Sequence, residues 1–200
     1  NTEGDGGPIN RAIGKGAVDV VNWGLALQRL LIGSAEAEHS IRSSSFDEVL
    51  TPTNFNIKDG STQGSAQAPA ARYDGKGLFI QKSGRRVYEL ALEGQGLGYV
   101  AEDLTALIPD LGETSAFSRI AVQRQPETRA YFVQDNGKVA VLVRDKAEEV
   151  LAWIQVETDG EVEDVAVLPG VGEDQVYFIV KRTVDGETVR FHEKLALDTE

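Results

Sequence analysis

Short apolar runs joined by tight turns recur along this chain, and that recurrence restricts its fold more than any other feature. Two examples are "LFIQKSGRRVYELAL" (Leu78 to Leu92) and "AYFVQDNGKVAVLV" (Ala130 to Val143). A third hairpin pattern surrounds Asp185-Gly186, and "RLLIGSAEAEHSIRS" (Arg29 to Ser43) is a weaker version. Asn-Gly and Asp-Gly supply the positive φ that a tight hairpin turn needs, so these patterns predict paired antiparallel strands.

The predicted hairpins are regularly spaced. Ile32, Ile80, Val133 and Ile179 each end the first run of a hairpin, and they lie roughly 50 residues apart, a period typical of propeller arrays with several strands per unit. We therefore predict an all-β fold: a β-propeller-like array of about four antiparallel four-stranded units. The last unit is incomplete, with three strands in this sequence.

The expected domain organisation follows from that period. Residues 1–15 are Gly-rich and aperiodic, which predicts a flexible lead, and residues 16–200 form one β-propeller-like domain. The expected units cover about 16–60, 61–112, 113–160 and 161–200. The chain begins at Asn1 and contains no Met, which favours a piece of a larger protein.

Charge and composition exclude several classes of function. The formal net charge is −12, so the protein is expected to repel phosphate backbones, and sequence-specific nucleic-acid binding is not expected. The sequence contains no Cys, which rules out disulfides and thiolate metal sites. No stretch approaches the roughly 18 apolar residues of a membrane span.

A search for catalytic or cofactor-binding patterns predicts none. "GQGLGY" (Gly94 to Tyr99) lacks the following helix of a dinucleotide site and is interpreted as a turn. His39 and His192 have no ligand-like neighbours in sequence, and "ETDGEVED" (Glu157 to Asp164) does not follow the spacing of a calcium loop. We therefore expect no catalytic residues, no cofactor and no metal site.

Two further groups of residues stand out. The first is a set of aromatic residues at matching positions of the repeat, which favours core packing over ligand stacking; it comprises Tyr73, Phe79, Tyr88, Tyr131, Phe132, Tyr177, Phe178 and Phe191. The second is a set of polar residues at two predicted hairpin tips, which are candidate partner-docking positions; it comprises Ser83, Arg85, Arg86, Asp135 and Asn136.

Several longer phrases resemble one known family. They include "FIQKSGRRVYELAL" (Phe79 to Leu92), "IAVQRQPETR" (Ile120 to Arg129) and "VKRTVDGETVRFHEKLAL" (Val180 to Leu197). Together with "LTPTNFNIKDGSTQGSA" and "WIQVETDGEVEDVAVLPG" they resemble the propeller region of bacteriophage tail nozzle proteins. That family is also called tail tubular protein B, or the tail-stabilisation protein of short-tailed phages. The family's Gly-Gly-Glu-Trp motif is absent from "LIGSAEAEH" (Leu31 to His39).

The resemblance implies a virion structural protein and not an enzyme. Under this interpretation the protein scaffolds tail assembly and the conduit through which DNA leaves. Its partners are the adaptor, the fibres and the tail tip, and the full-length protein is a homo-oligomer, a hexamer. The implied location is the phage tail, with assembly in the host cytoplasm.

Two alternatives remain open at this stage. The first is a carbohydrate-binding or glycoside-hydrolase-like β-propeller, for which Glu148, Glu149 and Trp153 offer two carboxylates and a stacking face. The second is a cellular adaptor propeller that binds peptides. A propeller is compatible with all of these functions, so the fold does not decide among them.

Overall fold

The computed structural model describes residues 4, 6–13, 19–44, 48–94, 98–145 and 150–196. Its regular structure is almost entirely β. Fifteen strands form four antiparallel sheets, and a single-turn helix, α1 (Asp110–Thr114), connects the second sheet to the third. The all-β prediction with an incomplete last unit is therefore confirmed. The expected flexible lead (residues 1–15) and the Gly94–Tyr99 turn lie partly outside the described residues.

Within each sheet, the strands follow one another in sequence order. The first sheet contains β1 (Val21–Ala26), β2 (Leu30–Ser34), β3 (Glu38–Arg42) and β4 (Asn56–Ser61). The second contains β5 (Ala71–Tyr73), β6 (Lys76–Ile80), β7 (Val87–Leu92) and β8 (Tyr99–Asp103). The third contains β9 (Phe117–Gln123), β10 (Arg129–Gln134), β11 (Val139–Asp145) and β12 (Val150–Val156). The fourth contains β13 (Glu161–Leu168), β14 (Gln175–Val184) and β15 (Glu187–Lys194).

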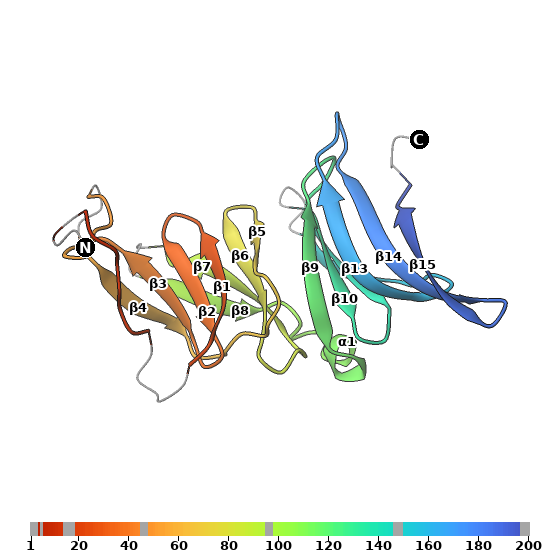
Figure 1. Ribbon diagram of the computed structural model, residues 1–200, viewed down its shortest axis with the longest axis horizontal. Helices are drawn as coiled ribbons and strands as arrows, with labels where there is room; N and C mark the ends of the chain where they lie inside the picture. The colour runs from red at the N-terminus through yellow and green to blue at the C-terminus, as the bar shows by residue number, and fades with distance from the viewer. Residues whose placement is uncertain are drawn as a thin grey trace.

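The four sheets stand one after another, as the blades of a propeller do, and the array is open (Figure 1). The two ends of the chain lie at opposite ends of the array. The third sheet approaches the second and the fourth mainly through its first two strands, β9 and β10. The first and second sheets approach each other most closely through their last strands, β4 and β8.

Each interface between neighbouring sheets has its own apolar cluster. Trp23 and Leu31 meet Phe79 and Leu90 between the first and second sheets. Two larger sets fill the other two interfaces. Between the second and third sheets lie Tyr73, Leu78, Ile80, Val87, Phe117, Ala130, Phe132 and Leu142, among others. Between the third and fourth lie Tyr131, Val133, Val139, Val141, Val162, Val165, Val176, Phe178 and Val180. The core is thus divided among the interfaces.

This division explains the continuous apolar runs in the repeat. In β6, Phe79 faces the first sheet, whereas its neighbours Leu78 and Ile80 face the third. In β10, Phe132 faces the second sheet and Tyr131 faces the fourth. Side chains alternate between the two faces of a strand, so a strand covered on both sides needs apolar residues at every position.

The aromatic set expected in the core is largely confirmed. Tyr73, Phe79, Tyr131, Phe132 and Phe178 are all buried. Phe191 is an exception, because it lies on β15, the edge strand of the three-stranded fourth sheet, and remains 38% exposed. Tyr177 packs against the His192 ring, with ring centroids 4.9 Å apart.

One buried carboxylate joins two sheets. Glu89 on β7 is 0% exposed and forms ion pairs with Lys76 of its own sheet and with Arg144 of β11, whose Nη1 lies 2.6 Å from Glu89 Oε2. Tyr73, beside this cluster, donates a hydrogen bond to the Thr128 carbonyl. Burial, followed by the negative charge of Asp74, raises the pKa of Tyr73 to about 12. The second and third sheets are therefore held by an ionic contact as well as by apolar packing.

Among the described residues, no helix has the length and apolar character needed to cross a membrane.

Candidate functional site

A cavity of about 330 Å³ lies at one end of the first sheet. It is built where the turn between β1 and β2 meets the end of β3 and the segment that follows it. Its walls combine apolar and polar side chains, and they comprise Ala26, Leu27, Gln28, Arg29, Leu30, Ile41, Arg42, Ser43, Glu48 and Leu50. Concave sites with apolar walls and a few converging polar groups are the usual form of small-molecule sites.

The pairing of β2 with β3 brings two arginines together in this cavity. Leu30 on β2 is the direct partner of Ile41 on β3. Arg29, just before β2, and Arg42, the last residue of β3, are the next residues along the chain from that pair, and both line the cavity. The Arg29 residue is only 7% exposed. The hairpin thus contributes an arginine from each of its two ends to the cavity wall.

The second sheet fixes the position of the turn that carries Arg29. The backbone N–H groups of Arg29 and Gln28 donate hydrogen bonds to the Tyr99 hydroxyl. The Arg29 guanidinium lies 6.0 Å from the centroid of the Tyr99 ring, at the outer limit of a cation–π contact. Burial raises the pKa of Tyr99, and it therefore stays neutral at physiological pH.

A carboxylate enters the cavity from the segment between β3 and β4. The Asn54 side-chain amide donates a hydrogen bond to Glu48 Oε2 at 2.5 Å, and its Oδ1 accepts one from the Ser44 backbone N–H at 2.5 Å. Asn54 is itself held by Thr51, whose Oγ1 accepts the Asn54 N–H at 3.1 Å. One carboxylate and two guanidinium groups therefore line the same cavity, the combination needed to activate a water molecule and to stabilise a developing oxyanion.

A second cavity of about 310 Å³ lies between the third and fourth sheets. Asp135, Glu161 and Glu163 contribute carboxylates to its wall. Two of them are in ion pairs: Lys181 Nζ lies 2.5 Å from Glu161 Oε2, and Arg190 contacts Glu163 through two hydrogen bonds of 2.7 and 3.0 Å. The hydrogen bond from Arg190 holds the pKa of Glu163 below its ordinary value. We interpret this cavity as part of the interface between the third and fourth sheets, lined by charged side chains that pair with each other.

Glu38 is a third acidic residue of interest, buried at the start of β3. Its Oε1 accepts a hydrogen bond of 2.7 Å from Ser65 Oγ, and Ser61 donates to its Oε2. Burial raises the pKa of Glu38, and the hydrogen bonds from Ser61 and Ser65 oppose the rise only in part. The protonated form is therefore favoured more in the folded protein than in the unfolded chain.

This imbalance predicts a pH-dependent effect of Glu38→Gln. A folded-state pKa above the unfolded value stabilises the protein at low pH, and that stabilisation is lost as the pH rises through the folded pKa. The variant has no such loss, so its free energy of unfolding should improve relative to the original protein between pH 4 and pH 7. Urea unfolding at several pH values measures the difference. Glu36→Gln, at an exposed position, is the control, and a Glu38→Gln difference independent of pH would contradict the prediction.

The structure brings the five predicted docking residues to one region. Ser83, Arg85 and Arg86 lie in the turn between β6 and β7, and the turn with Asp135 and Asn136 joins β10 to β11. Both turns contact the chain around the start of β9: the Gly84 carbonyl accepts the Phe117 N–H, and the Asp135 N–H donates to the Ala116 carbonyl. Arg86 also contacts Asp103, at 3.8 Å. A docking role for these residues stays a prediction.

Of the residues proposed for a glycosidase-like site, Trp153 is the one among the described residues. Glu148 and Glu149 lie outside the described residues. Trp153 packs between the second and third sheets, 5.2 Å from Phe132 between ring centroids, and its Nε1 donates a hydrogen bond to the Leu104 carbonyl. A tryptophan held in this way offers no face to a sugar.

Sequence reasoning did not select Arg29, Arg42 or Glu48. The signal for the arginines was present, because they occur at the two ends of the hairpin "RLLIGSAEAEHSIR". An antiparallel hairpin brings its two ends together, so like charges at those ends predict a cationic pair. Nothing comparable marks Glu48, whose position depends on Asn54.

The array of stacked antiparallel sheets, with a cavity at the end of one sheet, defines a propeller-like fold. A solved structure of a luciferin-regenerating enzyme is similar to it, with a TM-score of 0.52 and 13% sequence identity. The match covers 90% of this chain, which spans 62% of the length of that enzyme. No family model matches the sequence, and no curated protein matches it. At this identity the likeness shows the fold.

These comparisons correct the phage tail interpretation. The solved protein with a similar fold is an enzyme, and neither a family model nor a curated protein supports a tail nozzle or a virion component. The same similarity to an enzyme contradicts the expectation that the protein is purely structural and not an enzyme. The physical reason is that repeated hairpins and two-sided apolar strands are required by any propeller, so shared phrases of this kind reflect the fold.

The expected adaptor, fibre and tail-tip partners, the hexamer and the location in the phage tail rested on that resemblance alone. They stay untested predictions.

Proposed function

We propose that this protein is an enzyme-type β-propeller that binds a small organic molecule in the first-sheet cavity and hydrolyses it. The observation that carries the proposal is the convergence of Glu48, Arg29 and Arg42 on one cavity. Its volume of about 330 Å³ is at the lower end of the range for small-ligand sites, which favours a small substrate over a polymer. The likeness to an enzyme propeller adds support.

In this proposal Glu48 is the general base. Its Oε2 is oriented by Asn54, which leaves Oε1 to accept a proton from water. The guanidinium groups of Arg29 and Arg42 stabilise the negative charge that develops on the substrate oxygen. The substrate class follows the carbohydrate alternative and is a glycoside; a small ester is a second substrate that the same groups could hydrolyse.

A chromogenic panel of p-nitrophenyl glycosides and esters tests this function. We expect turnover by the unmodified protein and a decrease in kcat of about 10²- to 10⁴-fold in Glu48→Gln, because a positioned general base contributes that much to the rate. Circular dichroism establishes that the variant is folded.

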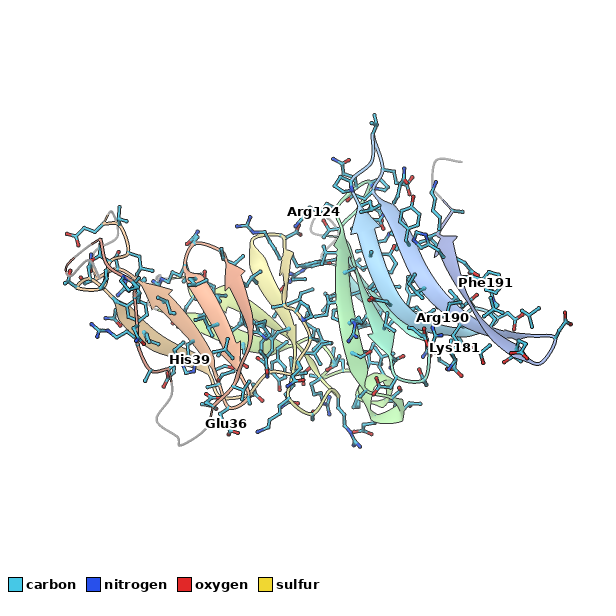
Figure 2. All side chains as sticks on the ribbon, in the orientation of Figure 1. Glu36, His39, Arg124, Lys181, Arg190 and Phe191 are labelled. Carbon is cyan, nitrogen blue, oxygen red and sulfur yellow. The ribbon has the colours of Figure 1, made fainter. Side chains whose placement is uncertain are left out.

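Glu36→Gln is the matched control. Glu36 lies in the turn between β2 and β3, at the opposite end of β2 from Arg29, and it pairs only with Lys82 among the contacts described, at 2.6 Å (Figure 2). This variant should retain full activity. Absence of turnover over the whole panel, or turnover that Glu48→Gln retains, would contradict the proposed function.

A further inference from the structure

The outer strand of the fourth sheet has an open edge. β15 pairs with β14 over its whole length, from Glu187 opposite Val184 to Lys194 opposite Tyr177. Among the described residues the first three sheets each contain four strands and the fourth contains three, so β15 has no neighbouring strand there on its other side. It lies at one end of the array (Figure 1). The backbone N–H and C=O groups along such an edge can pair with another strand.

Apolar side chains on β15 and β12 extend the core between the third and fourth sheets into solvent. Phe191 is the direct partner of Val180, and Ile154 is the direct partner of Val141. Val180 and Val141 belong to the apolar cluster between these two sheets. Directly opposite residues project from the same face of a sheet, so Phe191 and Ile154 face the same interface. The uncovered apolar set at this edge, 37–51% exposed, comprises Ile154, Val156, Val189 and Phe191.

The other two interfaces show what covers the corresponding positions. Between the first and second sheets, the fourth strands β4 and β8 approach each other. Between the second and third sheets, Trp153 of β12 donates a hydrogen bond to the carbonyl of Leu104, the residue after β8. A fourth strand on each side therefore closes the outer part of both interfaces. The third and fourth sheets approach each other mainly through β9, β10 and β13, and one fourth strand, β12, lies at the outer part of their interface.

A second copy of this protein does not fit at the open edge of β15. In a closed twofold dimer the two β15 strands would pair antiparallel, and the third sheets of both copies would lie on the same side of the joined sheet. The third sheet has one strand more than the fourth, and β9 lies beside β13 at the inner side of both. β12 of each copy would therefore extend over the β15 strand of the other copy, and the two β12 strands would occupy the same space. A single added strand avoids this overlap.

We propose that the open edge of β15 binds an extended segment of another protein, which adds to the fourth sheet as its fourth strand. The backbone of this segment pairs with β15, and every second side chain lies between Phe191 and Ile154. Main-chain pairing supplies affinity, and the apolar set at the edge selects segments with apolar residues at alternate positions. The edge belongs to the fourth sheet and the cavity to the first, so the inference is independent of the proposed function.

Fluorescence anisotropy with labelled synthetic peptides tests the inference on the intact protein. The probe is a capped peptide of seven residues, the length of β12, in which threonine and valine alternate. A peptide of the same composition, with its valines in one block, is the control. We expect the alternating peptide to bind about 10-fold more tightly or better, because the block cannot place all its valines on one face of a strand.

Two analogues of the alternating peptide test the backbone pairing. One is N-methylated at its valines and the other at its threonines. Successive N–H groups of a strand point to opposite edges, so only one of the two sets can donate to β15. One analogue should therefore lose affinity by about 10-fold or more, and the other should retain it.

Substitutions in two different sheets locate the bound peptide. Phe191→Ser on β15 (Figure 2) and Ile154→Ser on β12 should each weaken binding of the alternating peptide by about 10-fold, because each removes an apolar contact. Leu151→Ser is the matched control. Leu151 lies on β12 and is 45% exposed, close to the 51% of Ile154, but it is three positions away and projects from the opposite face. This variant should change the affinity by no more than about twofold. Circular dichroism of each variant checks its fold.

Hydrogen exchange and light scattering test whether the edge is open in the free protein. The β15 amides that point away from β14 should exchange fast without peptide and slowly with it. Slow exchange of these amides in the free protein, or a dimer that Phe191→Ser dissociates, would show that the edge is already covered and overturns the inference. Equal affinity for the alternating and block peptides, no binding of either, equal effects of the two N-methylated analogues, or equal losses in Leu151→Ser and Ile154→Ser overturn it as well.

Discussion

Glu89→Ala is expected to lower the free energy of unfolding by about 3–5 kcal/mol, the usual cost of removing one partner from a buried ion pair. Glu89 is fully buried between Lys76 and Arg144. Without its carboxylate, two positive charges remain close together in a partly dehydrated space, with no anion between them. Urea unfolding followed by tryptophan fluorescence measures the effect.

An exposed ion pair of similar length provides the control for Glu89. Lys82 Nζ lies 2.6 Å from Glu36 Oε1, and both side chains are more than half exposed. Such surface pairs contribute between 0 and about 1 kcal/mol, so Glu36→Ala should change stability little. A loss below about 1 kcal/mol for Glu89→Ala would show that the contact between the second and third sheets depends on apolar packing alone.

Gly33→Ala is the second substitution with a large expected effect. A Cβ atom at Gly33 would overlap the Trp23 indole, which is buried against Phe79 with ring centroids 5.7 Å apart. The indole cannot keep this position, so we expect a loss of about 3 kcal/mol, at the upper end for overpacked cores. Tryptophan emission should shift to the red as Trp23 becomes hydrated.

Two changes make the Gly33 measurement specific. A Trp153→Phe background leaves Trp23 as the single tryptophan, since the sequence has only two. Gly24→Ala in the same background is the control, because the nearest atom to a Cβ at Gly24 is the Leu31 carbonyl oxygen, 4.0 Å away. An unshifted emission spectrum and unchanged stability in Gly33→Ala would show that a Cβ at Gly33 fits without displacing the Trp23 indole, and would contradict the prediction.

The sequence was most informative where each strand is covered on both faces. The hairpins at Leu78–Leu92 and Ala130–Val143 lie in the two inner sheets, so their apolar runs and their turns carry a clear signal. Asp185 and Gly186 both have positive φ, as the predicted tight turn requires. In these segments the local hairpin pattern and the packing against neighbouring sheets favour the same structure, a pair of antiparallel strands.

The prediction was weakest in the first sheet. Its last strand, β4 (Asn56–Ser61), follows none of the hairpin patterns found in the sequence. This strand is polar, and its contacts include the backbone ladder with β3, the approach to β8 of the second sheet and the hydrogen bond from Ser61 to Glu38. No apolar alternation marks such a strand.

The candidate site was missed for a related reason. Its residues come from one turn, the end of β3 and the segment that follows β3, and they converge only after the sheet has formed. The sequence-based prediction instead placed candidate docking residues at hairpin tips of the second and third sheets. Repeats describe how the array is built, whereas the cavity depends on the features that set the first sheet apart.

The division of the core among three interfaces has a consequence for ligand binding. An inner sheet has packing partners on two sides, whereas the first sheet is supported mainly by the second. In stacked repeats each unit is stabilised by its neighbours, so the outermost units open first. The cavity lies in such an outermost unit. A compound bound there would hold closed the part of the molecule that otherwise melts earliest, and resistance to proteolysis near the first sheet would then report occupancy of the site.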